Sequence, residues 1–153
     1  MPEKAAADAT KDIKPPTPCD DMYMTDDNLV FQSYGRCCKA PNFFDDFYVT
    51  FLASSPEVRE KFTHTDMVAQ KHLLRAGILN LVLYARGLPP TKLRALAESH
   101  SRTRLDIQPH LYNYWLQALL DTILKHDSEI DKRGMEAWNN VLSKGIEVIR
   151  GGY

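Results

Sequence analysis

The chain has 153 residues, of which 44% are hydrophobic and 25% charged, so it can bury an apolar core without disulfide or metal staples. Its formal net charge of -1 gives no general attraction to nucleic acid or to an anionic membrane, and we expect neither as a partner. No apolar run approaches the roughly 18 residues that a membrane span needs. No apolar signal-peptide core follows the first methionine, so we expect a cytoplasmic protein.

The first 24 residues are rich in alanine and charged side chains and then in proline over 14–18. This composition buries too little apolar surface to offset the entropy of ordering the chain. We therefore expect a disordered or loosely docked N-terminal extension over residues 1–24 and one domain over residues 25–153. The three cysteines, Cys19, Cys37 and Cys38, fit neither a disulfide framework nor a standard zinc site, and the purpose of the Cys37–Cys38 pair stays open.

Every segment of the predicted domain has the apolar spacing of a helix, and no stretch alternates as a strand does. We predict an all-α protein of about seven helices with short connections. Capping residues, prolines and glycines indicate where the helices end. The expected helices run from 25 to about 40, from 41 to about 53, from 55 to 61, from 65 to about 86, from the 87–90 break to 100, from 109 to about 126, and from a cap at Asp127 or Ser128 to about 150, with a frayed end at 151–153.

His100 shares a helical face with Leu93, Leu96 and Ala97, so its imidazole points toward an apolar interior. A histidine in such a place is either a core residue with both nitrogens hydrogen-bonded or a ligand of a metal or cofactor. In the second role its other ring N–H needs an acceptor. The carbonyl of Leu96, four residues earlier, is one candidate.

Two polar side chains occur in apolar stripes earlier in the chain. Gln70 heads a stripe that continues through Leu74 and Ile78 to Leu81, and Tyr48 belongs to a stripe of phenylalanines. Gln70 marks either a helix end that reaches solvent or an amide placed over a ligand. The Tyr48 hydroxyl needs a hydrogen-bond partner if it is buried. A hydroxyl and an amide that meet in an apolar pocket would bind a small polar ligand.

Several short motifs follow one another in a characteristic order. They are Phe43-Phe-Asp-Asp-Phe-Tyr48, Pro56-Glu-Val58, Lys61-Phe62, Thr65-Asp-Met-Val-Ala-Gln70-Lys71 with Leu74, His100, Ile107-Gln-Pro-His-Leu-Tyr112 and Trp138. Each motif is weak alone, but the ordered set resembles the globin family. The resemblance is strongest to bacterial single-domain haemoglobins and the globin domain of flavohaemoglobins, and it covers about residues 26–150.

The resemblance implies a globin fold whose helices pack around haem b. His100 matches the proximal histidine that ligates the haem iron. Tyr48 and Gln70 match the distal residues beside the gas ligand. The implied or expected contacts with the cofactor are Phe62, Leu74, Leu96, Ile107 and Tyr112.

The implied function is reversible O₂ binding for storage, delivery or scavenging, with NO and CO as further ligands. Two alternatives stay open: NO dioxygenation with an external reductase, and gas sensing through a partner protein. In the flavohaemoglobins that the sequence resembles, a flavin and nicotinamide reductase follows the globin domain, and a glutamate late in the last helix supports the proximal histidine. We expect neither feature here, because the corresponding residues 151–153 are Gly-Gly-Tyr, and this favours O₂ binding. The oligomeric state is not predicted.

Other candidates carry weaker signals. Lys71, Arg102 and Arg104 are expected to be solvated charges unless one of them pairs with a haem propionate. His72 is expected to face water, and His126 is expected at the surface or at a helix end.

Overall fold

The computed structural model describes residues 24–153, so the predicted N-terminal extension lies outside the described residues except for Met24. The described chain forms seven α-helices and no strand, which confirms the all-α prediction. In none of these helices is there an apolar stretch long enough to cross a membrane. The helices are α1 (Asp26–Lys39), α2 (Phe43–Ser54), α3 (Pro56–Lys61), α4 (Met67–Ala85), α5 (Thr91–Ser99), α6 (Leu111–His126) and α7 (Lys132–Arg150).

Local sequence signals place several of the helix ends. The Ser55 hydroxyl accepts the backbone N–H of Glu57 at 3.1 Å, and Pro56 takes the first position of α3, which its fixed φ favours. The Asp66 carboxylate accepts two of the free N–H groups at the start of α4. That helix ends before Gly87, whose φ of 104° is a conformation that glycine adopts without steric cost.

The last helix begins later than the sequence predicts. Asp131 caps α7, and its carboxylate accepts the N–H of Gly134 at 2.8 Å. The Asp127 side chain is fully buried instead, and Arg36 donates two hydrogen bonds to its carboxylate at 2.6 and 2.9 Å. The prediction of a cap at Asp127 or Ser128 is wrong, because an ion pair with a residue 91 positions away leaves no local signature.

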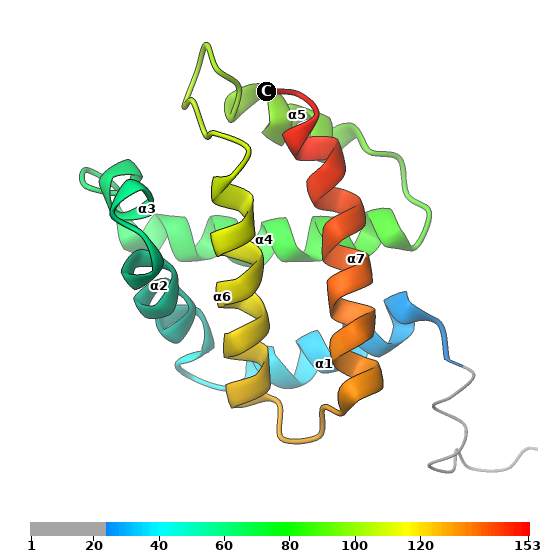
Figure 1. Cartoon of the computed structure of the whole chain (residues 1–153). Coiled ribbons are helices and arrows are strands. Elements are labelled where there is room, and N and C mark those ends of the chain that lie inside the picture. Colours follow the sequence, from blue (N-terminus) through cyan, green and yellow to red (C-terminus); the bar gives the residue numbers. More distant parts are fainter. Residues whose placement is uncertain (1–23) are drawn as a thin grey trace, which may run out of the picture.

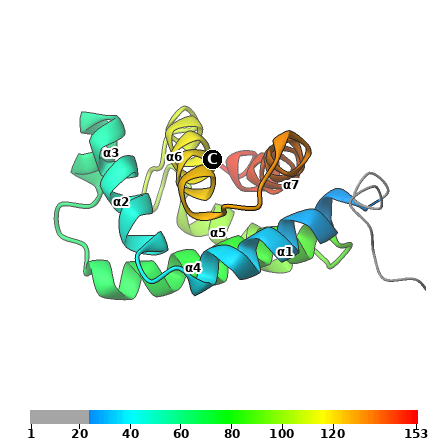
Figure 2. The ribbon, with the colours of Figure 1, turned by 90° about the horizontal axis from the view of Figure 1, so that it is seen from below.

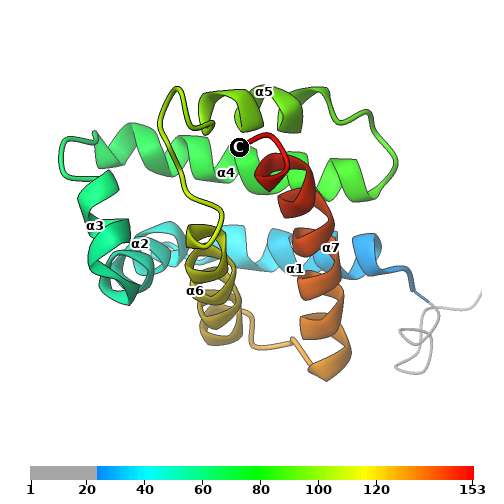
Figure 3. The same cartoon turned by 45° about the horizontal axis from the view of Figure 1, so that its top comes forward.

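The helices form two crossed layers. α6 and α7 lie side by side in front of α1 and α4, which run across them (Figure 1). Seen from below, α2, α6 and α7 form one row, and α1 and α4 form the other (Figure 2). α1 packs on α7, and α2 packs on α6. Figure 3 shows α5 beside the C-terminal end of the chain, in agreement with its contacts with α7.

Large side chains from both layers form the core. Trp138 on α7 is fully buried, and its indole N–H donates to the Ser33 hydroxyl on α1 at 2.8 Å. Ser33 in turn donates to the Asp127 carboxylate at 2.6 Å. Phe47 on α2 is also fully buried, and its ring packs edge-on against Tyr48 with 4.9 Å between centroids. The core therefore holds Tyr48 at a defined place on α2.

Candidate functional site

Tyr48 and Phe62 are neighbours on one side of the candidate site. Tyr48 is only 4% exposed, and its ring centroid lies 5.9 Å from that of Phe62, which follows α3. The Tyr48 hydroxyl donates to the backbone carbonyl of Gln70 at 3.5 Å, which is long for a bond of this kind. Burial raises the pKa of Tyr48 to about 12, so the hydroxyl stays protonated at neutral pH. It is therefore a hydrogen-bond donor with only a weak internal partner.

The Tyr48 hydroxyl donates to the backbone carbonyl of Gln70, and the Gln70 side chain lies close enough to act against burial on the pKa of Tyr48. The Gln70 side chain is half-buried, and its amide makes no hydrogen bond within residues 24–153. Leu74 lies one turn later on α4 and is buried. We call Tyr48, Phe62, Gln70 and Leu74 the distal group.

His100 follows directly on α5, as the residue that caps its C-terminal end, and is half-buried. Its Nδ1 lies 2.9 Å from the hydroxyl oxygen of Tyr112 on α6. Its Nε2 has no hydrogen-bond partner among the residues that the structure describes. Burial lowers the pKa of His100, which favours the neutral imidazole that metals bind. One ring nitrogen is thus held in place, and the other is free to act as a ligand.

Leu96 and Ile107 contact His100 through the backbone. The Leu96 carbonyl accepts the backbone N–H of His100 and the hydroxyl of Ser99, both at 2.9 Å. The N–H of Ile107 donates to the His100 carbonyl at 3.0 Å. The Leu96 carbonyl is therefore used within the helix end, and the imidazole pairs with the hydroxyl of Tyr112 instead. We call Leu96, His100, Ile107 and Tyr112 the proximal group.

A connection between the two groups was not predicted from the sequence. Lys61 precedes Phe62, and its Nζ donates at 2.8 Å to the backbone carbonyl of Asp106, which precedes Ile107. The Tyr153 hydroxyl donates to Oδ1 of Asp106 at 2.6 Å. The expected frayed end at 151–153 is therefore wrong for Tyr153. These partners lie 45 and 47 residues apart in the chain, and no local pattern indicates such contacts.

The basic side chains considered above all have partners in the described chain. Lys71 pairs with Asp45 at 2.6 Å, Arg104 pairs with Glu98 at 3.3 Å, and the Arg102 guanidinium lies 4.9 Å from the ring centroid of Tyr153. Each of these basic groups would have to leave its present partner before it could bind another anion.

Two side chains away from the candidate site also have a described environment, one of them half-buried and the other fully buried. His126, expected at the surface or at a helix end, is the last residue of α6. Its side chain is 16% exposed, and its Nε2 lies 2.7 Å from the Asp46 carboxylate. Cys37 is fully buried, and burial raises the pKa of its thiol to about 12. Cys37 is therefore a packing residue, whereas Cys38 beside it is half-buried.

The donor atoms around His100 fit a cofactor that brings its own metal. Residues 24–153 contain no cluster of three His, Cys, Asp or Glu side chains that could hold a metal ion by themselves. His100 offers a single nitrogen ligand, and Leu96 and Ile107 beside it in the chain pack against the hydrophobic core. An iron porphyrin supplies four ligands itself and needs one axial imidazole and apolar contacts, so this set of residues fits haem.

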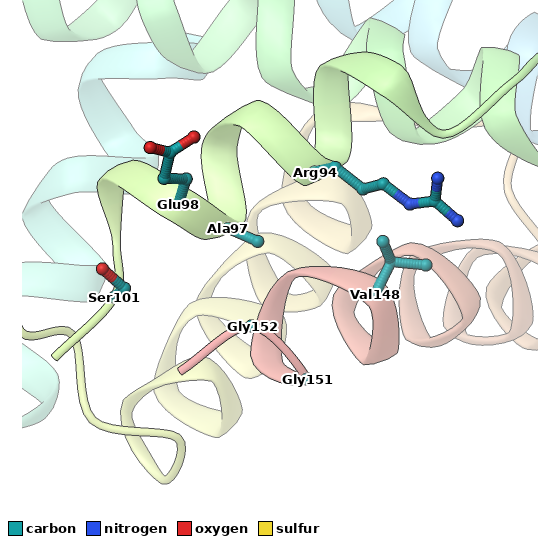
Figure 4. Close-up of a pocket in the computed structure, with 7 residues that line it drawn as sticks. All are labelled: Arg94, Ala97, Glu98, Ser101, Val148, Gly151 and Gly152. Carbon is teal, nitrogen blue, oxygen red and sulfur yellow. The ribbon is translucent and has the colours of Figure 1, made fainter.

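A separate groove of about 390 Å³ lies between α5 and the end of α7 (Figure 4). Its lining residues are Arg94, Ala97, Glu98, Ser101, Val148, Gly151 and Gly152. No member of the distal or proximal group lines this groove, so it is distinct from the candidate site.

One solved structure, of a protein from Pseudomonas aeruginosa PAO1, is similar to this chain over most of its length. The two are 57% identical, the alignment covers 84% of this chain and 98% of the other, and the TM-score is 0.83. That protein is described as structurally highly homologous to a human hemoglobin. No protein-family model and no curated protein matches the sequence. At this identity and coverage the chain belongs to the same family, and it is a bacterial globin-like protein with a globin fold.

Proposed function

We propose that the protein binds haem b through His100 and holds O₂ reversibly beside Tyr48 and Gln70. The observation that carries the proposal is the His100 ring, whose Nδ1 is held by Tyr112 at 2.9 Å while Nε2 is free within the described chain. A hydrogen bond to the second ring nitrogen orients a ligating imidazole and raises its basicity. The relationship to a protein described as highly homologous to hemoglobin supports haem as the cofactor.

Ferrous haem, when bound, supplies a coordination position for O₂, NO or CO. Phe62, Leu74 and Ile107 would offer apolar surface to the porphyrin. Leu96 and Tyr112 would orient His100, one through its backbone and the other through its hydroxyl.

Tyr48 and Gln70 would favour O₂ over CO. O₂ draws more negative charge from ferrous iron than CO does, so a hydrogen bond to it is worth on the order of 1.5–3 kcal/mol. One such donor changes affinity about tenfold or more. The Tyr48 hydroxyl would give up only its 3.5 Å contact to turn toward the ligand. We therefore expect tightly bound and slowly released O₂.

An absorption spectrum of the purified protein tests the proposal. We expect a Soret band that shifts on reduction and again with O₂ and with CO. His100→Ala should weaken or remove the band, whereas His72→Ala should leave it unchanged because His72 is exposed on α4. A colourless protein that takes up no added haem would overturn the proposed function, as would a His100→Ala variant with the wild-type spectrum.

A further inference from the structure

Three separate segments of the chain meet at Asp106. This residue lies in the loop between α5 and α6 with a φ of 52°, a left-handed conformation that aspartate tolerates better than most residues. Lys61, at the end of α3, donates to its carbonyl at 2.8 Å, and Tyr153, beyond α7, donates to its carboxylate at 2.6 Å. The loop is thus held from two sides at one residue.

Tyr153 is itself fixed against the loop and against α5. The backbone N–H of Arg102 donates to the Tyr153 carbonyl at 3.4 Å, and the Arg102 guanidinium lies 4.9 Å from the centroid of the tyrosine ring. Gly152 passes so close to Ala97 that a Cβ on Gly152 would lie 2.8 Å from the Ala97 Cβ (Figure 4). The hydrogen bond to the Asp106 carboxylate raises the pKa of Tyr153, so its hydroxyl remains a donor.

The backbone of the loop connects Asp106 to His100. The N–H of Asp106 donates to the Ser101 carbonyl at 2.9 Å, and the N–H of Ile107 donates to the His100 carbonyl at 3.0 Å. These two bonds close the loop onto His100, which caps α5, and onto Ser101, which follows it. If Asp106 moved, the backbone of His100 would therefore move with it.

Lys61 connects Asp106 to the distal group. Lys61 is followed by Phe62, whose ring packs 5.9 Å from that of Tyr48. The Lys61 ammonium thus joins the turn that carries Phe62 to the loop that carries Ile107. One residue, Asp106, is connected to both groups of the candidate site.

We propose that Asp106, together with Lys61 and Tyr153, is a clamp that keeps the distal and proximal groups in position and slows the release of haem. The proposal rests on the proposed function, because it assumes that haem contacts both groups. If the groups must separate for haem to leave, the contacts at Asp106 have to break as well. Among the described residues, the His100 ring is hydrogen-bonded to Tyr112 and to none of these three, so they are positioning residues.

The rate of haem transfer to an excess of a haem-free acceptor globin tests this proposal. Asp106→Gly keeps the left-handed backbone but removes the carboxylate, and Tyr153→Phe removes only the hydroxyl. We expect each variant to release haem roughly three- to tenfold faster than the wild type. The double variant should be no faster than the faster single variant, because both changes break the same bond. Asp106→Asn, which retains an acceptor oxygen and tolerates the same φ, should restore most of the wild-type rate.

Tyr114→Phe is the matched control, since Tyr114 is exposed and its hydroxyl has no partner in the described chain. A spectroscopic readout separates positioning from general stability: the ferrous iron–histidine stretching band should shift in Asp106→Gly and Tyr153→Phe but not in Tyr114→Phe. Unchanged release rates and an unchanged band in Asp106→Gly and Tyr153→Phe would overturn the clamp and leave haem binding by His100 intact. A wild-type protein that takes up no haem would overturn the proposed function and the clamp together.

Discussion

Nδ1 of His100 lies 2.9 Å from the hydroxyl oxygen of Tyr112, which approaches the ring from the next helix. The two ring centroids are 6.1 Å apart and their planes are tilted by 33°. Burial raises the pKa of Tyr112 to about 12, so the hydroxyl is protonated at neutral pH. With the proton of the neutral imidazole on Nδ1, the ring donates to Tyr112 and keeps the lone pair of Nε2 free. This tautomer is the one that axial ligation through Nε2 requires.

Tyr112→Phe should therefore remove the hydrogen bond that orients the His100 imidazole, and leave the imidazole itself in place as the proposed iron ligand. One neutral hydrogen bond contributes about 1 kcal/mol, so we expect haem to leave roughly fivefold faster. The ferrous iron–histidine stretching band should also shift, because the imidazole loses an acceptor that raises its basicity. Tyr114→Phe on the same helix is the control. A Tyr112→Phe protein with the wild-type band and the wild-type rate would show that Tyr112 does not tune His100.

Tyr48→Phe should raise the O₂ dissociation rate by about tenfold or more and change the CO dissociation rate much less. The reason is that the Tyr48 hydroxyl would donate a hydrogen bond to the bound gas, and bound O₂ carries more negative charge than bound CO. Flash photolysis and stopped-flow mixing with the reduced protein measure both rates. The stability of the haem-free protein should change little, because the internal contact of the hydroxyl is 3.5 Å long. An unchanged O₂ rate would show that Tyr48 is not the distal donor.

Features whose signals are local could be predicted from the sequence. The α3 helix was predicted to end at Lys61 and to start at Ser55–Pro56, because a capping hydroxyl and a proline at the first position both act within one turn. The face shared by His100 and Leu93 follows from helical spacing in the same way. The resemblance to globins then added the grouping of residues from different helices, such as Tyr48 with Gln70.

Features that depend on distant partners could not be predicted. Asp127 precedes the last helix and has the character of a cap, yet its carboxylate pairs with Arg36. Tyr153 follows two glycines and is typical of a frayed end, yet its hydroxyl finds Asp106. In both cases the local sequence is compatible with solvent exposure, and only the packing of α1 or of the loop after α5 decides otherwise.

Asp127→Ala should destabilise the protein strongly. The carboxylate accepts hydrogen bonds from Arg36, from the Ser33 hydroxyl and from the backbone N–H of Glu129, so its removal leaves several donors without a partner. We expect a loss of about 2–4 kcal/mol in the free energy of unfolding. The Arg36 side chain is 31% exposed and can still reach water, which keeps the loss below that of a fully enclosed pair. Asp121→Ala, at an exposed site on α6, should cost less than about 0.5 kcal/mol in the same urea titration.

Asp127 should also make stability depend on pH at the acid end. Burial alone would raise the pKa of Asp127, but hydrogen bonds from Arg36 and Ser33 outweigh burial and lower the pKa below the usual value of an aspartate. Between the two pKa values the unfolded chain binds more protons than the folded one, so stability falls as pH falls. The contribution of the carboxylate is complete above the unfolded pKa and disappears as pH drops through the folded pKa.

Urea titrations of the wild type and Asp127→Asn at a series of pH values measure this contribution. The difference in unfolding free energy should be constant above about pH 5 and should shrink below about pH 4, since the asparagine side chain does not titrate. Arg36 stays charged throughout this range, so the change belongs to the carboxylate. If the unfolding free energies of the two proteins differed by the same amount down to acid unfolding, Asp127 would have the same pKa in the folded and unfolded states. The hydrogen bonds around Asp127 would then not lower its pKa.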